Sequence, residues 1–479
     1  RKTEVLMHKI LFCTATIISI VFLSGCRVND NESVEDIVNL VNGERPNIIF
    51  ILTDDQRWDA LGFAGNDIIH TPDMDKLAGE GLFFSNAFVT TSICAASRAT
   101  LFTGLYERTH NYTFGKPNLR DEYMYESYPF LLRQAGYRTG MIGKFGVNVN
   151  EGIIDSMFDW KKLTFWPYLK NIDGKQVHLA DINGNHAIDF IKSSGDQPFC
   201  LSLSFWSPHA DDGAEEQYFW PEYCDELYTN ITIPVPETAD PSFFEALPGF
   251  LQTTMNRERW YWRYDTPEKY QEMVKGYYRM ISCVDSVIAR IRLTLEQEGL
   301  ADNTIIILMG DNGYFLGERG YAGKWLTYEQ SIRVPLIIYD PRLPEENRKK
   351  TYGEMVLNVD LTPTILKLAG LDIPGRYQGE SLTAFYASRP DKWRNGIFCE
   401  HRLENNELLP ETECYRDSVW KFIRYEDAPE LIELYNLIED ENETENLAYD
   451  QKYAEKVEYY KNKCDSIAGS LLSDRIQKE

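Results

Sequence analysis

The run Asn47-Ile-Ile-Phe-Ile-Leu52, followed at once by Thr53 and Asp54-Asp55, is the first indication of the fold of this chain. A second run of the same kind, Asn303-Thr-Ile-Ile-Ile-Leu-Met309, leads into Asp311-Asn312-Gly313. Apolar runs without alternation are typical of strands that are buried on both faces of a parallel sheet. Because functional groups collect at the carboxyl ends of such strands, we expect the two polar segments to meet at one sheet edge.

Helical patterns lie between these strands, and this alternation predicts an α/β fold with helices on both faces of the sheet. The segments that we expect to be helical are 72–80, 96–102, 128–135, 185–192 and 270–297. Thr71 directly precedes the first of them and is of a residue type that caps helix N-termini.

The pattern changes beyond about residue 388. Residues 419–425 and 433–435 alternate like half-exposed strands, and a long helical segment follows from Gln451. We therefore predict a large catalytic domain over residues 45–388 and a smaller α+β subdomain over residues 389–479.

The first 44 residues read as an export signal and a tether. Residues 10–23 form an apolar run that is short for a membrane span and typical of a secretory signal. The run ends in Leu23-Ser24-Gly25-Cys26, which resembles a bacterial lipobox, and residues 27–44 are polar. We expect residues 1–26 to be a signal peptide, with the protein held in the periplasm, outer membrane or cell surface by a lipid on Cys26. A plain signal peptide without lipidation is the alternative.

Composition excludes some classes of partner. A net charge of −25 makes nucleic acid an unsuitable partner, because phosphate binding needs a basic surface. An anionic small substrate would need a local group of Arg and Lys side chains. Apart from Cys13 and Cys26, the seven cysteines are scattered and form no CxxC pair, which argues against a zinc site or a dense disulfide framework.

The polar residues after the two buried strands suit a hard divalent cation. Asp54, Asp55, Asp311 and Asn312 would offer only oxygen ligands, which points to a hard ion, Ca²⁺ or Mg²⁺, rather than to zinc. Each pair taken alone could equally be a helix cap or a turn.

The segment Ser92-Ile-Cys94-Ala-Ala-Ser97-Arg98-Ala-Thr-Leu-Phe-Thr103-Gly104 carries the candidate nucleophile. Cys94 stands where a helix is expected to begin, so backbone N–H groups would face a bound anion there. Arg98 lies one turn further along the same face and could neutralise that anion. Gly104 is placed to end the helix.

This segment resembles the signature of the type I sulfatases, a family with an alkaline-phosphatase-like mixed sheet covered by helices on both faces. The resemblance implies that a maturase oxidises Cys94 to Cα-formylglycine, whose hydrated aldehyde attacks sulfur. It also implies that Asp54, Asp55, Asp311, Asn312 and the modified Cys94 bind the cation. Ala96 stands where the family commonly has proline. A buried structural cysteine is the alternative.

Further matches extend the resemblance from about residue 45 to about residue 450. Gly143-Lys144-Phe145-Gly146 stands where the family has Gly-Lys-Trp-His, so Lys144 is a candidate sulfate contact and the family's histidine is replaced by Gly146. We expect Gly146 to leave room there, and Asn148 to take over the contact. The resemblance implies that His209 protonates the leaving alcohol, with Lys324 nearby.

These features predict a sulfatase that acts on sulfated carbohydrate, and the content of 29 Tyr, 24 Phe and 10 Trp suits stacking on sugar rings. One alternative is a phosphate or phosphonate ester hydrolase on the same fold, although the seven histidines offer little for a second metal site. The other is a non-catalytic glycan-binding relative, which the missing histidine at Gly146 would favour.

Overall fold

The computed structural model describes residues 45–114, 117–402 and 409–478. The predicted signal peptide, lipobox and tether lie outside these residues. Among the helices of the described part, none is long and apolar enough to cross a membrane.

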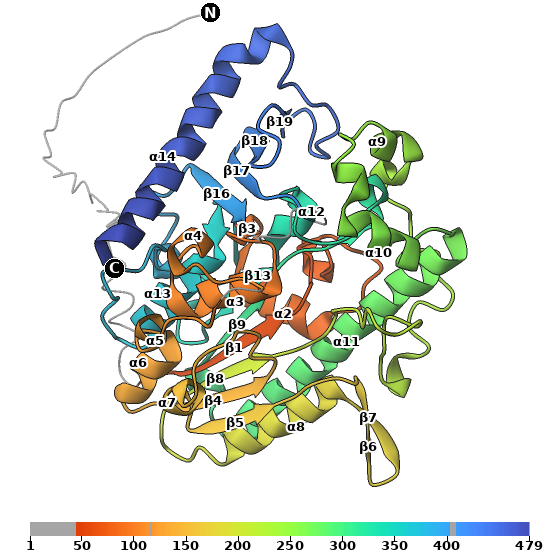
Figure 1. Cartoon of the computed structure of the whole chain (residues 1–479). Helices are drawn as coiled ribbons and strands as arrows, with labels where there is room; N and C mark the ends of the chain where they lie inside the picture. The colour runs from red at the N-terminus through yellow and green to blue at the C-terminus, as the bar shows by residue number, and fades with distance from the viewer. Residues whose placement is uncertain (1–44, 115–116, 403–408, 479) are drawn as a thin grey trace, which may run out of the picture.

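A mixed eight-stranded sheet forms the centre of the molecule (Figure 1). Its strands, in spatial order, are β14 (Lys350–Tyr352), β2 (Leu82–Phe84), β13 (Leu336–Tyr339), β9 (Thr304–Gly310), β1 (Asn47–Thr53), β8 (Phe199–Ser204), β4 (Arg138–Gly143) and β5 (Trp160–Leu163). The strands from β9 to β5 are parallel to one another, whereas β13 is antiparallel to both β9 and β2. The two predicted strands are therefore direct neighbours at the middle of the sheet.

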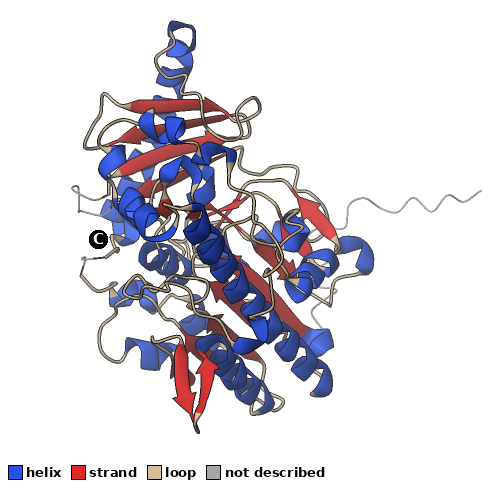
Figure 2. Ribbon diagram, turned by 90° about the vertical axis from the view of Figure 1, so that its right-hand side faces the viewer, coloured by secondary structure: helices blue, strands red, loops and turns tan. Residues whose placement is uncertain are grey.

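Side chains of β1 alternate between two apolar cores, one on each face of the sheet. Ile48, Phe50 and Leu52 belong to one core, and Ile49 and Ile51 to the other. The first core is covered by α3 (Cys94–Thr103), α6 (Tyr128–Gln134) and α13 (Leu361–Leu368). The second is covered by α2 (Pro72–Glu80), α8 (Leu179–Lys192) and α11 (Pro267–Gln297). Figure 2 shows long helices lying in front of the strands of the sheet. The predicted α/β class is confirmed.

The shorter elements lie mainly in the connections. The short helices are α4 (Glu107–His110), α5 (Asp121–Met124), α7 (Ile153–Met157), α9 (Pro241–Glu245), α10 (Met255–Arg263) and α12 (Glu329–Ile332). The short strands are β3 (Ala87–Phe88), β12 (Arg333–Val334) and β15 (Val356–Leu357) in one small sheet, β10 (Phe315–Leu316) with β11 (Ala322–Gly323), and β6 (Leu169–Ile172) with β7 (Lys175–His178).

All five predicted helical segments are helical, and Thr71 is the N-cap residue of α2 as expected, but its side chain does not cap the helix. The Thr71 side chain makes no capping bond; its hydroxyl instead accepts from the backbone N–H of Gly62. The N-terminus of α2 is satisfied from α11, because the Asp285 carboxylate accepts from the N–H groups of Asp73 and Met74 at 3.3 and 2.7 Å. A carboxylate at this end also opposes the positive end of the helix dipole.

The C-terminal part forms a four-stranded antiparallel sheet with a long helix against it. The strands are β16 (Gly396–His401), β17 (Thr412–Asp417), β18 (Trp420–Tyr425) and β19 (Ile432–Asn436), followed by α14 (Ala454–Lys478). Buried residues of this sheet, such as Phe422 and Leu434, join the same apolar core as β1. The subdomain is therefore packed on the large sheet through a continuous core, and the boundary at residue 388 stays a prediction. The seven cysteines of the described residues are all free and buried.

Candidate active site

The carboxyl ends of β1 and β9 bring four predicted oxygen ligands together. The strands pair in parallel with Thr53 opposite Gly310, so the residues that follow them start at the same level. The backbone N–H of Asp55 donates to Asp311 Oδ1 at 3.1 Å, and Asn312 Nδ2 donates to Asp55 Oδ1 at 2.6 Å. Asp54, Asp55, Asp311 and Asn312 are all buried, so a close cluster of acidic groups lies beneath the surface.

Three cationic side chains from three different segments face this acidic cluster. Lys144, directly after β4, forms an ion pair with Asp54, and Lys324, directly after β11, forms one with Asp55. Arg98 of α3 donates through Nε to Asp311 Oδ2 at 2.8 Å. Three positive charges therefore balance the three carboxylates. A divalent cation bound here would give the site a net positive charge, which a bound anion could neutralise.

The surrounding charges shift the pKa values of Asp54 and Asp311 in opposite directions. Burial raises the pKa of Asp54, but the surrounding cations, Lys144 above all, outweigh it and hold that pKa well below its usual range. Burial, together with the negative charge of Asp54, raises the pKa of Asp311 to about 7. Two adjacent carboxylates thus compete for the same positive charge, which is the situation that a bound cation relieves.

Cys94 is the first residue of α3 and lies against the same cations. All ten residues of α3 are buried, and the helix ends at Gly104, whose N–H donates to Thr100 O with φ at 67°. Burial lowers the pKa of Lys144 and Lys324, but the carboxylates and the Cys94 sulfur raise it above its usual value. The predicted helix start and end are confirmed, and the Cys94 sulfur lies within electrostatic reach of both lysines.

His209 lies on the loop after β8, on the side of the cluster next to Asp55. Its Nε2 is 3.7 Å from Asp55 Oδ2, and its Nδ1 is 2.6 Å from the carbonyl oxygen of Ala210. Asp54, Asp55 and His209 each offer a ligand atom, and these atoms lie within 4.8 Å of one another. Burial lowers the pKa of His209, which makes its imidazolium a stronger acid.

The atoms that lack partners fit a hard cation. Asp54 Oδ1 and Asn312 Oδ1 are buried and have no hydrogen-bond partner in the described part of the chain. A buried oxygen without a partner is costly, and a divalent cation that prefers oxygen ligands would remove that cost at both atoms. Asp311 differs, because its two oxygens already accept from Asp55 and Arg98.

Gly146 does not leave the room that we expected. A Cβ atom at this position would lie 2.5 Å from Arg98 Cδ, and the φ of +78° is one that glycine adopts readily. Asn148, expected to take over the missing histidine contact, has an exposed side chain, and its backbone N–H donates to the buried Tyr112 hydroxyl. The space of the family's histidine is therefore closed by Arg98, and the exposure of Asn148 argues against the expected contact.

Gly146→Ala should therefore displace Arg98 and, given the predicted role of Arg98 in binding the anion, lower kcat/KM by about 10-fold or more. Gly152→Ala is a matched control, because Gly152 has φ of +84° but nothing within 4 Å of its Cβ position. Both variants carry the same left-handed strain, of about 1–2 kcal/mol. Steady-state kinetics with equal losses in the two variants would show that Arg98 is not affected.

Two contacts of the site were missed at the level of sequence. Ser204 ends β8 and accepts from Arg98 Nη1, and the Tyr277 hydroxyl of α11 donates to the carbonyl oxygen of Asp55 at 2.7 Å. The run Phe199–Ser204, with few polar residues, could have indicated a third parallel strand and hence Ser204 at its end. No local signal marks Tyr277, because its contact spans 222 residues.

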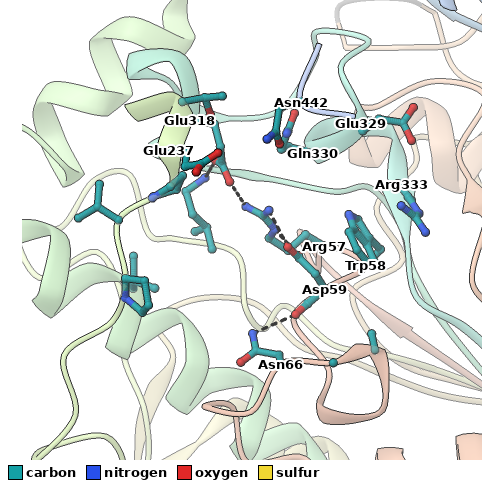
Figure 3. A pocket seen from close by; sticks show the side chains of 18 of the residues that line it. Arg57, Trp58, Asp59, Asn66, Glu237, Glu318, Glu329, Gln330, Arg333 and Asn442 are labelled. Atoms are coloured by element: carbon teal, nitrogen blue, oxygen red, sulfur yellow. Dashed lines mark hydrogen bonds and ion pairs between the residues drawn. The ribbon is translucent and has the colours of Figure 1, made fainter. Parts of the chain in front are cut away.

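A cleft of about 800 Å³ lies apart from these residues (Figure 3). Arg57 crosses it to Glu318 at 2.6 Å, and Arg333 stacks on Trp58 with 3.8 Å between guanidinium carbon and ring centroid. None of the predicted catalytic or metal-binding residues lines this cleft. Gln330 does line it, and its backbone carbonyl oxygen accepts a hydrogen bond from the N–H of Tyr314. The cleft therefore adjoins the segment that follows Asn312.

Two family models match the chain over most of its length. Residues 46–371 match the sulfatase model, and residues 317–468 match the model of the N-sulphoglucosamine sulphohydrolase C-terminal region. The first match spans both strands of the acidic cluster, Cys94 and His209. The chain belongs to the sulfatase family. It is accordingly a sulfuric ester hydrolase.

Curated relatives of this sulfatase align along most of its length. The chain is 27% identical to an N-acetylglucosamine-6-O-sulfatase of Bacteroides thetaiotaomicron, over 86% of this chain and 84% of the relative. It is 26% identical to an arylsulfatase of Clostridium perfringens, over 87% of this chain and 92% of the relative.

Solved structures share the fold. A protein solved in complex with its substrate D-glucosamine-2-N,6-O-disulfate superposes with a TM-score of 0.75 at 25% identity, over 91% of this chain and 99% of the other. A phosphonate monoester hydrolase of Agrobacterium radiobacter reaches the same TM-score at 22% identity, over 89% and 96% of the two chains. The second likeness concerns the fold alone, so it gives no support to the phosphonate alternative.

Proposed function

We propose that this sulfatase removes sulfate from carbohydrate by means of a formylglycine that is made from Cys94. One bound divalent cation, Ca²⁺ in preference to Mg²⁺, assists the reaction. The observation that carries the proposal is the position of Cys94 at the start of a buried helix, within electrostatic reach of Lys144, Lys324 and Arg98. Formylglycine supplies an aldehyde hydrate as the nucleophile, and the cation supplies positive charge at the sulfate oxygens.

The side chains of the site have separate tasks in this proposal. Asp54, Asp55, Asp311 and Asn312 hold the cation, and this assignment is supported by Asp54 Oδ1 and Asn312 Oδ1, which accept no hydrogen bond within the described part of the chain. Arg98, Lys144 and Lys324 bind the sulfate oxygens, which lowers the barrier most where negative charge accumulates in the transition state.

In this proposal His209 protonates the oxygen of the leaving alcohol, which is supported by the positions of His209 and Lys324 next to different oxygens of Asp55. A sugar alkoxide leaves poorly without a proton, and His209 Nδ1 is held by the Ala210 carbonyl so that Nε2 faces the acidic cluster. The proton therefore starts on Nε2 and ends on the alcohol oxygen.

His209→Ala should slow the hydrolysis of a sugar sulfate by roughly 10²–10⁴-fold, which is the usual contribution of general acid catalysis. An activated aryl sulfate should lose far less, because its phenolate departs without much protonation. Parallel measurements of kcat for both substrates test this, and equal losses would assign His209 to binding or structure and leave Lys324 as the acid.

The relatives support sulfated carbohydrate as the substrate class. One is named for a sulfate on N-acetylglucosamine, and one structural neighbour holds a disulfated glucosamine as its substrate. Hydrolysis of a panel of sulfated mono- and disaccharides by protein co-expressed with a formylglycine-generating maturase tests the proposal. Release of sulfate from none of them would contradict it.

The remaining expectations are part of the same proposal. The chain would be exported and held at the periplasmic or outer surface through a lipid on Cys26, with no direct membrane span. Two relatives named extracellular sulfatases, from Drosophila melanogaster and Caenorhabditis elegans, support an extracytoplasmic location. Mass spectrometry of the membrane fraction would detect the lipidated N-terminal peptide.

A further inference from the structure

Helix α10 forms a wall beside the candidate active site and carries three arginines, Arg257, Arg259 and Arg263. The fully buried Asn256 of this helix donates through Nδ2 to the carbonyl oxygens of Lys324 and Ala322, at 2.8 and 3.2 Å. The helix is thereby fixed to the segment from which the Lys324 side chain reaches Asp55.

Arg259 connects the two loops that hold His209 and Lys324. Its guanidinium carbon lies 4.4 Å from the ring centroid of Trp325, and its Nη1 lies 3.5 Å from the Cβ position of Gly323. Its Nη2 forms an ion pair with Asp212, three residues after His209. Arg259 therefore contacts the chain neighbours of Lys324 and a residue three positions after His209, the two residues that we place near the leaving-group oxygen.

This wall has surplus positive charge in an otherwise acidic protein. Asp212 pairs with Arg259 and also with Arg263, whose side chain is fully buried. Arg259 Nε and Arg263 Nε and Nη1 are buried donors without a hydrogen-bond partner in the described ranges. Of these two arginines, Arg259 is the one with side-chain exposure, of 13%, and Asp212 beside it has 28%.

We propose that Arg259, oriented by Asp212 and Trp325, binds a second anionic group on the carbohydrate, a sulfate or a carboxylate of the leaving alcohol. This inference rests on the proposed function. Because His209 and Lys324 flank the ester oxygen, the sugar attached to that oxygen extends over the loops that Arg259 connects. A guanidinium that shares its carboxylate with a second arginine prefers an anionic oxygen to a neutral hydroxyl.

The test compares substrates that differ by one anionic group. The probes are glucosamine 6-O-sulfate, D-glucosamine-2-N,6-O-disulfate, and a monosulfated disaccharide with a uronic acid next to the sulfated ring. We expect matured wild-type enzyme to prefer one of the two doubly anionic probes in kcat/KM. Arg259→Gln should lower that preference by about 10- to 100-fold, as for other hydrogen bonds to charged groups. The preferred probe identifies the second group as sulfate or carboxylate.

Two further variants separate recognition from structure. Arg257→Gln is the matched control, because Arg257 lies on the same helix but stacks on Phe244 and donates to the Gly320 carbonyl; its preference should equal that of the wild type. Arg259→Lys, which keeps the charge, should recover part of the preference. Calorimetric binding of the same probes to Cys94→Ala protein, with and without Arg259→Gln, gives the affinity in the absence of turnover.

Two results would overturn the inference and leave the sulfatase function intact: a wild type without preference for either doubly anionic probe, or an Arg259→Gln variant with equal losses on all probes. A matured wild type that hydrolyses neither these probes nor an aryl sulfate would instead contradict the proposed function itself.

Discussion

Cys94→Ala should lower the turnover of every sulfate ester by on the order of 10⁶-fold, which is the loss found when the nucleophile of a serine protease is removed. Cys94 starts a helix in which Arg98 makes the contact with Asp311, so the small alanine should leave the fold and these ion pairs in place. Thermal unfolding should therefore be close to that of the wild type.

The control is Cys200→Ala, because Cys200 is equally buried but lies within β8, away from the acidic cluster. The Cys200→Ala variant should have a lower free energy of unfolding, whereas its kcat should equal that of the wild type. Mass spectrometry of the peptide that carries residue 94 should show, in active wild type, a form lighter than cysteine, as expected when sulfur is replaced by oxygen with loss of hydrogen. An active preparation that contains only unmodified Cys94 would refute the mechanism.

Removal of the divalent cation should lower kcat by about 10³–10⁵-fold, because a metal ion supplies several kcal/mol of charge stabilisation in the transition state. Without it, Asp54 Oδ1 and Asn312 Oδ1, which have no hydrogen-bond partner among the described residues, lack a ligand, so the melting temperature should fall as well. Dialysis against chelator, followed by addition of Ca²⁺ or Mg²⁺, measures both effects and ranks the two ions.

Asp55→Asn should abolish the rise in melting temperature on addition of Ca²⁺, since Asp55 loses the charge that faces Lys324 and the proposed ion. Asp59→Asn is the comparison, because Asp59 is close in sequence but pairs with Arg57 at the cleft outside the acidic cluster. Metal-free protein with full activity, or the same Ca²⁺ response in both variants, would exclude the cation site.

The sequence was sufficient for those parts of the site that depend on local pattern. The apolar runs placed β1 and β9 in a parallel sheet, and their parallel pairing carries Asp55 and Asn312 to the same edge. Helix α3 likewise ends at Thr103, because the glycine that follows, Gly104, is a local signal for a helix end and forms its C-cap.

Contacts between distant segments could not be predicted in this way. Asp285 caps α2 across more than two hundred residues, and only the packing of α11 on α2 brings it there. The closed space at Gly146 depends on the path of the Arg98 side chain, which no pattern of residue types indicates. The ion pair of Arg259 with Asp212 likewise requires two loops to be folded against each other.

The burial of α3 bears on whether Cys94 is oxidised before or after the chain folds. In the folded protein every residue from Cys94 to Thr103 is buried, with at most 6% of any of them exposed. The maturase that we propose for Cys94 would have to bind the chain around this residue, and we therefore expect it to act on a nascent or unfolded polypeptide. Oxidation of Cys94 must then be completed before the chain folds. A molecule that folds with unmodified Cys94 should stay inactive. Overproduction without additional maturase should yield a mixture of two stable populations that differ at one residue and not in shape.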